Sequence, residues 1–162
     1  GKTGAVDRAA SLEGQLVQAT GVLLERGDLE MMQLIGGQNG LRATEDQGVV
    51  PDVPTPAPLG RWQITGEICD GKCASGAMRP GRGIAHRACA NLCLLGGGPP
   101  VFVATAPVDG DAFMLINGEG DEVLPPALVD YVGLYITVEA DVARHGDLLV
   151  VTLDADSVEV FE

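Results

Sequence analysis

Apolar and polar residues alternate in several short stretches of the chain, which is the period-two pattern of strands with one buried face. Alternating or continuously apolar stretches of strand length predict strands at 16–24, 29–34, 62–68, 101–104 and 112–116. Turn residues such as Arg26-Gly27-Asp28 separate neighbouring stretches and indicate hairpins. The pattern therefore predicts a protein built mainly of β-strands.

The segment 131–153 repeats the segment 12–34. Shifted by 119 positions, the two overlay without a gap, share five identical residues and carry the same Gly-Asp-Leu turn. Hairpins of the same type have similar sequence patterns, and this alone would explain the likeness without any closer relationship between the two segments. The matching alternation favours a stronger interpretation, in which two related β units lie on either side of the middle of the chain.

The middle of the chain has a different pattern. Residues 85–95 can form about three helical turns, and the run Gly96-Gly97-Gly98-Pro99-Pro100 predicts where the helix ends. Residues 74–84 are rich in glycine and proline and are predicted to be a loop. Residues 124–132 are expected to form a short helix or a loop before the last hairpin.

Three parts are predicted: an N-terminal β unit over 1–42, a proline-rich linker over 43–58, and a Cys/His-containing β domain over 59–162. The 23 glycines and 10 prolines favour short strands and turns over a helical bundle. The predicted fold is mainly β, with OB-like small barrel or hairpin units and one cysteine-bearing loop and short helix inserted.

The net charge of −13 argues against binding to nucleic acid and to anionic membrane surfaces. Against this background, the segment 61–87 is locally about +3, because only Glu67 and Asp70 oppose its five basic residues, Arg61, Lys72, Arg79, Arg82 and Arg87. Either these residues form internal salt bridges, or they attract an anionic ligand or an acidic protein partner. The sequence gives no oligomeric state.

No stretch has the roughly 18 apolar residues of a membrane span, and no signal peptide is recognisable. The abrupt start at Gly1-Lys2 is typical of a mature or trimmed form. Clustered cysteines suit disulfides in an oxidising compartment, or a metal site in any compartment. We expect an exported protein, periplasmic or at the cell surface, with any membrane tether outside this chain.

All four cysteines lie within 25 residues, together with one of the two histidines: Cys69, Cys73, His86, Cys89 and Cys93. The spacing is C-x3-C, fifteen residues, then C-x3-C, and the second half reads H-x2-C-x3-C. On a helix, the last three residues share one stripe. Soft ligands on one face suggest a metal site, a disulfide pair or a redox thiol.

A metal site is the first hypothesis. Cys73, His86, Cys89 and Cys93 would supply three thiolates and one imidazole, the donor set of structural zinc, and copper(I) accepts the same ligands. Cys69 is a possible extra ligand or a disulfide partner. The spacing matches neither standard iron–sulfur run, and covalent haem would need C-x-x-C-H.

Structural disulfides are the second hypothesis. The twin C-x3-C pattern resembles that of disulfide-clamped helical hairpins, a resemblance that implies the pairs Cys69–Cys93 and Cys73–Cys89. Glycines and prolines between 71 and 83 leave no good first helix, so the same pairs would join a strand end to a helix. In the chain-entropy model, each disulfide that closes a loop of this size stabilises the folded state by roughly 3 kcal/mol.

Thiol redox or nucleophilic chemistry is the third hypothesis. Lys72 adjoins Cys73, and His86 and Arg87 precede Cys89. Neighbouring cations favour the reactive thiolate. The chain lacks C-x-x-C and any signature of a cysteine protease or reductase, so a non-enzyme is favoured over an enzyme.

The run from Gly66 to Val103 contains D-x-K-C, then H-x-x-C-x-x-x-C and G-G-G-P-P. In this it resembles uncharacterised bacterial exported or membrane-anchored proteins. The resemblance implies a shared set of Asp70, Lys72, Cys73, His86, Cys89 and Cys93, with Cys69 as an addition, and it favours the metal site. It implies no activity.

These patterns together predict a non-catalytic, metal-binding accessory module of an exported assembly of redox or electron-transfer type, with a protein partner. Zinc or copper would be bound by Cys73, His86, Cys89 and Cys93, while Asp70, Lys72 and Arg87 surround the ligands. The alternatives are a disulfide-stabilised structural or protein-interaction module and a thiol-based oxidoreductase.

Overall fold

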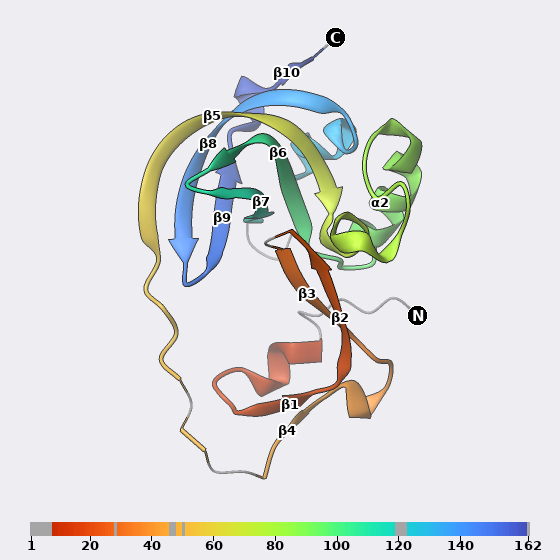
Figure 1. The fold of residues 1–162 in the computed structure, drawn as a ribbon, viewed down its shortest axis with the longest axis vertical. Coiled ribbons are helices and arrows are strands. Elements are labelled where there is room, and N and C mark those ends of the chain that lie inside the picture. Colours follow the sequence, from red (N-terminus) through yellow and green to blue (C-terminus); the bar gives the residue numbers. More distant parts are fainter. Residues whose placement is uncertain (1–7, 28, 46–47, 50, 119–122, 162) are drawn as a thin grey trace.

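The computed structural model describes residues 8–27, 29–45, 48–49, 51–118 and 123–161. Its main body is a small closed barrel (Figure 1), whose five strands are β5 (Ala57–Asp70), β6 (Pro100–Val108), β7 (Asp111–Ile116), β8 (Tyr135–His145) and β9 (Leu148–Leu153). Their order is β8-β5-β6-β7-β9, and pairing between β8 and β9 closes the ring. The pairing of β7 with β9 is parallel and the other pairings are antiparallel. The mainly β, OB-like prediction is therefore confirmed.

The barrel interior holds the hydrophobic core. Strands of the wall point alternate side chains inward, and along β8 every second residue from Ile136 to Val142 is buried. The largest fully buried apolar side chains are Phe102, Ile68, Met114, Leu128, Ile136 and Leu149. Leu128 comes from η5 (Pro126–Tyr131), a short 3-10 helix in the segment predicted to be a short helix or a loop.

The connection from β5 to β6 carries the cysteines. It contains a π-helical turn, η3 (Cys73–Ala77), a 3-10 turn, η4 (Ile84–His86), and the α-helix α2 (Arg87–Leu95). The helix predicted at 85–95 thus forms as η4 and α2 and ends before the glycine run. The prediction of a loop over 74–84 is wrong at its start, because Cys73, Ala74 and Ser75 are buried in a helical turn, in which Gly76 departs from helical backbone angles.

The N-terminal part forms two small two-stranded sheets below the barrel in Figure 1. One joins β1 (Val17–Ala19) to β4 (Leu41–Ala43), and the other joins β2 (Gly21–Arg26) to β3 (Leu29–Leu34). Two 3-10 turns, η1 (Ala10–Leu12) and η2 (Gln38–Gly40), flank them. The single strand predicted over 16–24 is divided at Thr20, whose backbone bonds to Gly40 and Ile35 instead.

The two repeated segments form hairpins of the same register. Six residue pairs join β2 to β3, from Gly21↔Leu34 to Arg26↔Leu29, and six pairs join β8 to β9, from Ala140↔Leu153 to His145↔Leu148. Each pair of the first hairpin corresponds to a pair of the second at the 119-residue shift. The turn residue Asp28 itself lies outside the described residues.

The surroundings of the two hairpins differ. In the barrel, β8 also pairs with β5, and β9 also pairs with β7, whereas β2 and β3 pair only with each other within the described residues. Leu23 is 51% exposed where its counterpart Val142 is 2% exposed, and Met32 is 48% exposed where Val151 is fully buried. The N-terminal hairpin therefore lacks the strands that cover its counterpart.

The connection between the two parts is extended. Residues 51–56 have no regular structure and are exposed, as expected for a proline-rich linker, but β5 already begins at Ala57, inside the predicted linker. Residues 46, 47 and 50 of that predicted segment lie outside the described residues. After β9, the turn η6 (Ala155–Ser157) leads to β10 (Glu159–Val160), which pairs with β8. Among the described helices, none has the length and apolar character needed to cross a bilayer.

Candidate metal centre

The candidate centre begins where β5 ends. Asp70 is the last residue of β5 and its side chain is completely buried. Its Oδ1 accepts a hydrogen bond of 2.8 Å from the backbone N–H of Cys73, the first residue of η3. A carboxylate that caps the next turn in this way fixes the local backbone. Asp70 therefore sets the position from which the Cys73 thiol enters the interior of the inserted segment.

Three donors from three elements converge on one point. Cys73 of η3, His86 of η4 and Cys89 in the first turn of α2 place one ligand atom each within 4.8 Å of one another. Cys73 and His86 are buried, while Cys89 is half-buried. This is the separation of atoms that bind a common ion, so the three residues could hold a metal.

A second group shares Cys73 with the first. Asp70, Cys73 and Cys93 also place their ligand atoms within 4.8 Å of one another, and all three are buried. The sulfur atoms of Cys73 and Cys93 are 4.0 Å apart. The structure thus brings all four predicted ligands, Cys73, His86, Cys89 and Cys93, into two overlapping groups and adds the carboxylate of Asp70.

The imidazole of His86 is oriented by Asp70. Its Nε2 lies 3.2 Å from Asp70 Oδ2, and the two side chains are 5% and 0% exposed. A histidine that binds a metal through one ring nitrogen commonly donates the other ring N–H to a carboxylate. With Nε2 facing Asp70, Nδ1 is the nitrogen left for a ligand.

Cys69 belongs to neither group. Its thiol donates a 2.6 Å hydrogen bond to Oε1 of Glu67, which also accepts a 3.0 Å hydrogen bond from the backbone N–H of Gly83. Glu67 and Cys69 are buried, and they share one face of β5 because they are two residues apart. Sequence reasoning missed Glu67, although the i, i+2 spacing on a predicted strand could have indicated its contact with Cys69.

The pKa values of two thiols are raised. Burial, with the hydrogen bond and charge of Asp70 and the proximity of Cys93, raises the pKa of Cys73 well above the ordinary value. Burial, with the hydrogen bond and charge of Glu67, also raises the pKa of Cys69, against a weak opposing effect of Arg82. Burial and the neighbouring carboxylates thus favour the protonated thiol at both positions, and a thiol is less nucleophilic than a thiolate.

None of the four cysteines, all of which are described, forms a disulfide in the structure. The pairs Cys69–Cys93 and Cys73–Cys89 are not formed. The Cys69 thiol donates a hydrogen bond to Glu67, and the Cys73 sulfur interacts with the sulfur of Cys93. The twin pattern misleads here because strand geometry turns Cys69 toward Glu67.

The basic residues of this segment are largely without acidic partners. Of the five, only Arg61 forms ion pairs with other described residues, namely Glu139, Asp141 and Asp154. Arg87 donates to the backbone oxygen of Asp130 at 2.6 Å. Internal salt bridging thus accounts for Arg61, whereas Lys72, Arg79, Arg82 and Arg87 form no ion pair with another described residue.

Neither comparison with protein-family models nor searches of curated proteins and solved structures yields a match for this chain. The arrangement of Cys73, His86, Cys89, Cys93 and Asp70 is therefore what bears on function. Three thiols and an imidazole beside a buried carboxylate could hold one metal ion, and the described residues contain no candidate cluster apart from these two overlapping groups.

Proposed function

We propose that this protein is a non-catalytic metal-binding module in which Cys73, His86, Cys89 and Cys93 bind one zinc or copper(I) ion. The observation that carries the proposal is the convergence of Cys73, His86 and Cys89 within 4.8 Å, with the Cys93 sulfur 4.0 Å from that of Cys73. Soft sulfur donors with one imidazole suit zinc and copper(I) and are poor ligands for magnesium or calcium.

The charges around the site support a bound cation. A metal ion deprotonates the thiols that bind it, and three thiolates beside the buried Asp70 carboxylate would be strongly unfavourable without a counter-charge. Asp70 itself takes a supporting role, since its two oxygens already face His86 Nε2 and the Cys73 N–H. Lys72, Arg79 and Arg82 add positive charge outside the ligands.

A closed set of four protein ligands supports a structural or metal-holding role. Catalytic zinc sites keep a coordination position open for water or substrate, whereas structural sites fill all four with protein atoms. We therefore infer an accessory module of an exported assembly of redox or electron-transfer type, in which a metal stabilises the inserted segment and a protein partner uses the basic surface around it.

A disulfide-stabilised module is the second candidate, and the 4.0 Å separation of the Cys73 and Cys93 sulfur atoms favours it. A small movement would bring this pair to bonding distance. In this second candidate the disulfide joins Cys73 to Cys93, and the pairs Cys69–Cys93 and Cys73–Cys89 implied by the twin C-x3-C pattern are absent.

The test is elemental analysis of protein purified without chelators, with free thiols counted after denaturation in EDTA. One zinc or copper per chain with four thiols supports the metal module. Absence of metal with two thiols fewer supports the disulfide candidate and contradicts the proposal. Loading with cobalt(II) gives a second readout, because intense thiolate-to-cobalt absorption reports sulfur ligands and the visible bands report tetrahedral geometry.

Cys69 supplies a matched control. C73S, C89S and C93S should each lower metal affinity by tenfold or more and reduce the thiolate absorption of the cobalt form. C69S replaces a cysteine of the same segment, keeps a hydroxyl to donate to Glu67, and should leave both readouts unchanged. Equal losses in C69S and C93S would contradict the assigned ligand set.

A further inference from the structure

No described strand pairs with the outer edge of β3, which is called the open edge below. Its counterpart in the barrel, β9, pairs along that edge with β7 at Leu115↔Val150 and Ile116↔Val151. At the 119-residue shift, these positions of β9 correspond to Met31 and Met32 of β3, which pairs with β2 alone within the described residues. Open strand edges present backbone N–H and C=O groups that can pair with another extended chain.

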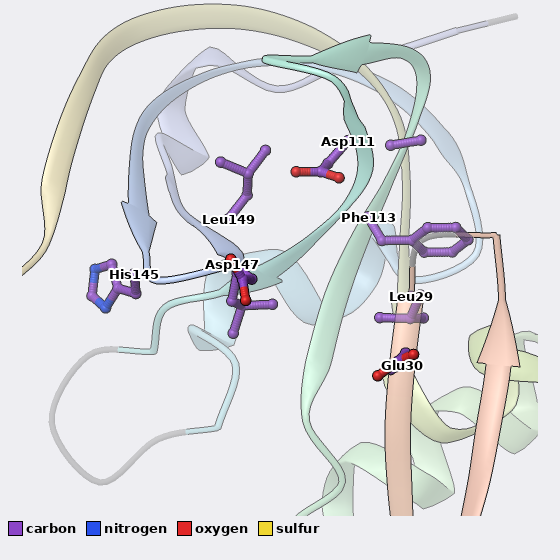
Figure 2. A pocket seen from close by; sticks show the side chains of 9 residues that line it. Leu29, Glu30, Asp111, Phe113, His145, Asp147 and Leu149 are labelled. Atoms are coloured by element: carbon purple, nitrogen blue, oxygen red, sulfur yellow. The ribbon is translucent and has the colours of Figure 1, made fainter. Parts of the chain in front are cut away.

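A pocket of about 510 Å³ lies along this edge. Figure 2 shows Leu29 and Glu30 of β3 on one side and the β8–β9 turn, with His145 and Asp147, on the other, while β2 lies on the far side of β3. The lining residues come from β3 (Leu29 and Glu30), from β7 (Asp111 to Phe113) and from the β8–β9 hairpin (His145 and Asp147 to Leu149).

The pocket follows the backbone edge of β3. Leu29 and Glu30 are consecutive strand residues, so their side chains point to opposite faces, and yet both line the pocket. A cavity over one face of the hairpin would meet only one of them. An occupant would therefore meet the backbone of β3 as well as its side chains.

The opposite wall comes from a gap in the barrel. β7 and β9 pair only at residues 115–116 and 150–151, so their first residues diverge. Phe113 and Leu149 line the pocket from these diverging ends, and Leu29 lies beneath Phe113 in Figure 2. Apolar side chains thus stand on both sides of the gap.

The rim of the pocket is acidic. Glu30 and Asp147 are exposed and form no ion pair with another described residue, whereas Asp111 is held by Arg144 at 3.1 Å. Two carboxylates therefore remain for a ligand, one on each side. An extended partner chain in which basic side chains alternate with apolar ones would match this rim.

We propose that this pocket binds an extended peptide segment of alternating basic and apolar residues, which adds as a strand to the open edge of β3. The segment would lie along the edge of β3 at Leu29 and Glu30, with its apolar side chains against Leu29, Phe113 and Leu149 and its basic side chains toward Glu30 and Asp147. This goes beyond the proposed metal module and involves none of its ligands. Strand addition of this kind gains affinity from backbone hydrogen bonds and specificity from alternate side chains.

The test uses the synthetic peptide Ac-Lys-Val-Lys-Val-Lys-NH2 and measures backbone amide shifts of the full chain by NMR. The shifts are expected in β3, at 111–113 and at 145–149. The acidic counterpart Ac-Glu-Val-Glu-Val-Glu-NH2 should bind at least tenfold more weakly. A basic peptide with N-methyl groups on alternate residues keeps the charges and loses backbone pairing, so it should also bind at least tenfold more weakly.

Charge-matched variants separate the pocket from general electrostatic attraction. E30Q/D147N should weaken binding of the basic peptide about fivefold, since exposed ion pairs contribute up to about 1 kcal/mol each. E13Q/E159Q removes two exposed carboxylates elsewhere and should leave binding within twofold. Equal effects of the two variants, or equal binding of the N-methylated peptide, would overturn the proposal.

Two further results would also overturn it. One is the absence of amide shifts at millimolar basic peptide. The other is sedimentation that shows a dimer whose interface occupies β3, because a second copy would then be the occupant. Repeating the titration with C93S separates this proposal from the metal module, since loss of metal in that variant is expected to leave peptide binding at β3 unchanged.

Discussion

His86 Nε2 lies 3.2 Å from Oδ2 of Asp70, and neither side chain is more than 5% exposed. The other oxygen of the carboxylate accepts the backbone N–H of Cys73. One buried carboxylate thus positions two of the four candidate ligands, one through its ring and one through its backbone.

Asp70→Asn is expected to lower metal affinity about 10–100-fold, the usual cost of removing a group that orients a metal-bound histidine. Asparagine has the same shape but only one acceptor oxygen, so it cannot accept from both His86 and Cys73. Competition with a chromophoric chelator measures the affinity, and one metal per chain should still bind at saturation. Unchanged affinity in D70N would show that His86 needs no support from Asp70.

Gly81→Ala is expected to disturb the centre from outside the ligand set. A Cβ at Gly81 would collide with the backbone carbonyl of Cys73 and approach Met78 O. Forcing such an atom into packed structure costs about 1–3 kcal/mol, and relief requires the backbone of Cys73 to move. The expected result is lower thermal stability together with weaker metal binding.

Gly36→Ala is the matched control for this substitution. A Cβ at Gly36 would meet nothing within 4 Å, and its backbone lies outside the left-handed region. Its melting temperature and metal affinity should equal those of the unmodified chain. If G81A matches G36A in both measurements, the Cys73 backbone is more adaptable than its contacts indicate.

The metal-free protein should lose stability at alkaline pH through Cys69. Burial and the Glu67 carboxylate raise the pKa of Cys69 in the folded state, while the unfolded thiol titrates near pH 8.5. The folded state therefore holds a proton that the unfolded state loses. The stability from this thiol is complete below about pH 8.5 and declines above it, by up to about 1.4 kcal/mol per pH unit.

Urea unfolding in EDTA at pH 8 and pH 9.5 measures this decline. C69S lacks the titrating thiol and retains Cys73, so its stability should fall less steeply than that of the unmodified chain. Alkylation mapped by mass spectrometry should find Cys69 slow to react in the folded protein at both pH values. Parallel declines in the two proteins would assign the effect to other groups.

The hairpins were predictable from sequence because their information is local. Alternation, a Gly-Asp turn and the 119-residue repeat predicted β3 at its observed bounds and matched it to β9. The sequence predicted a small barrel but not which strands close it, because the parallel pairing Leu115↔Val150 joins residues 35 positions apart and has no local sequence signal. The length of β5 was underestimated, since Ala57 and Pro58 pair with Arg144 and Ala143 although their sequence resembles a linker.

The candidate ligands were predictable for the same reason, and Asp70 was predicted to lie near them, but the individual contacts of the neighbouring residues were not. His86, Cys89 and Cys93 follow helical spacing, and the structure places them on η4 and α2. The exclusion of Cys69 depends on strand alternation, which turns it toward Glu67. The contact of Asp70 with His86 depends on the path of the residues between them, for which the glycines and prolines predicted only a loop.

Arg26 links the N-terminal hairpin to the cysteine segment, and Arg26→Ala is expected to loosen that hairpin alone. Its Nη1 donates a 2.8 Å hydrogen bond to the backbone oxygen of Ala74, a fully buried residue next to Cys73. Removing the donor leaves that oxygen without this bond, at a cost of about 1–3 kcal/mol. Within the described residues, β2 and β3 pair as strands only with each other, so contacts with the cysteine segment, among them the 3.8 Å bond from the Ser75 hydroxyl to Met31 Sδ, hold the hairpin in place.

Hydrogen exchange read out by NMR distinguishes local loosening from general destabilisation. In R26A, the amides of β2 and β3 should exchange faster by roughly tenfold, as about 1.4 kcal/mol of lost local stability implies, while those of β6 and β8 keep their rates. R42A is the control, because Arg42 is exposed and, among the described residues, its side chain bonds only to Gln18. Faster exchange across the whole barrel in R26A would mean that the hairpin and the barrel unfold as one unit.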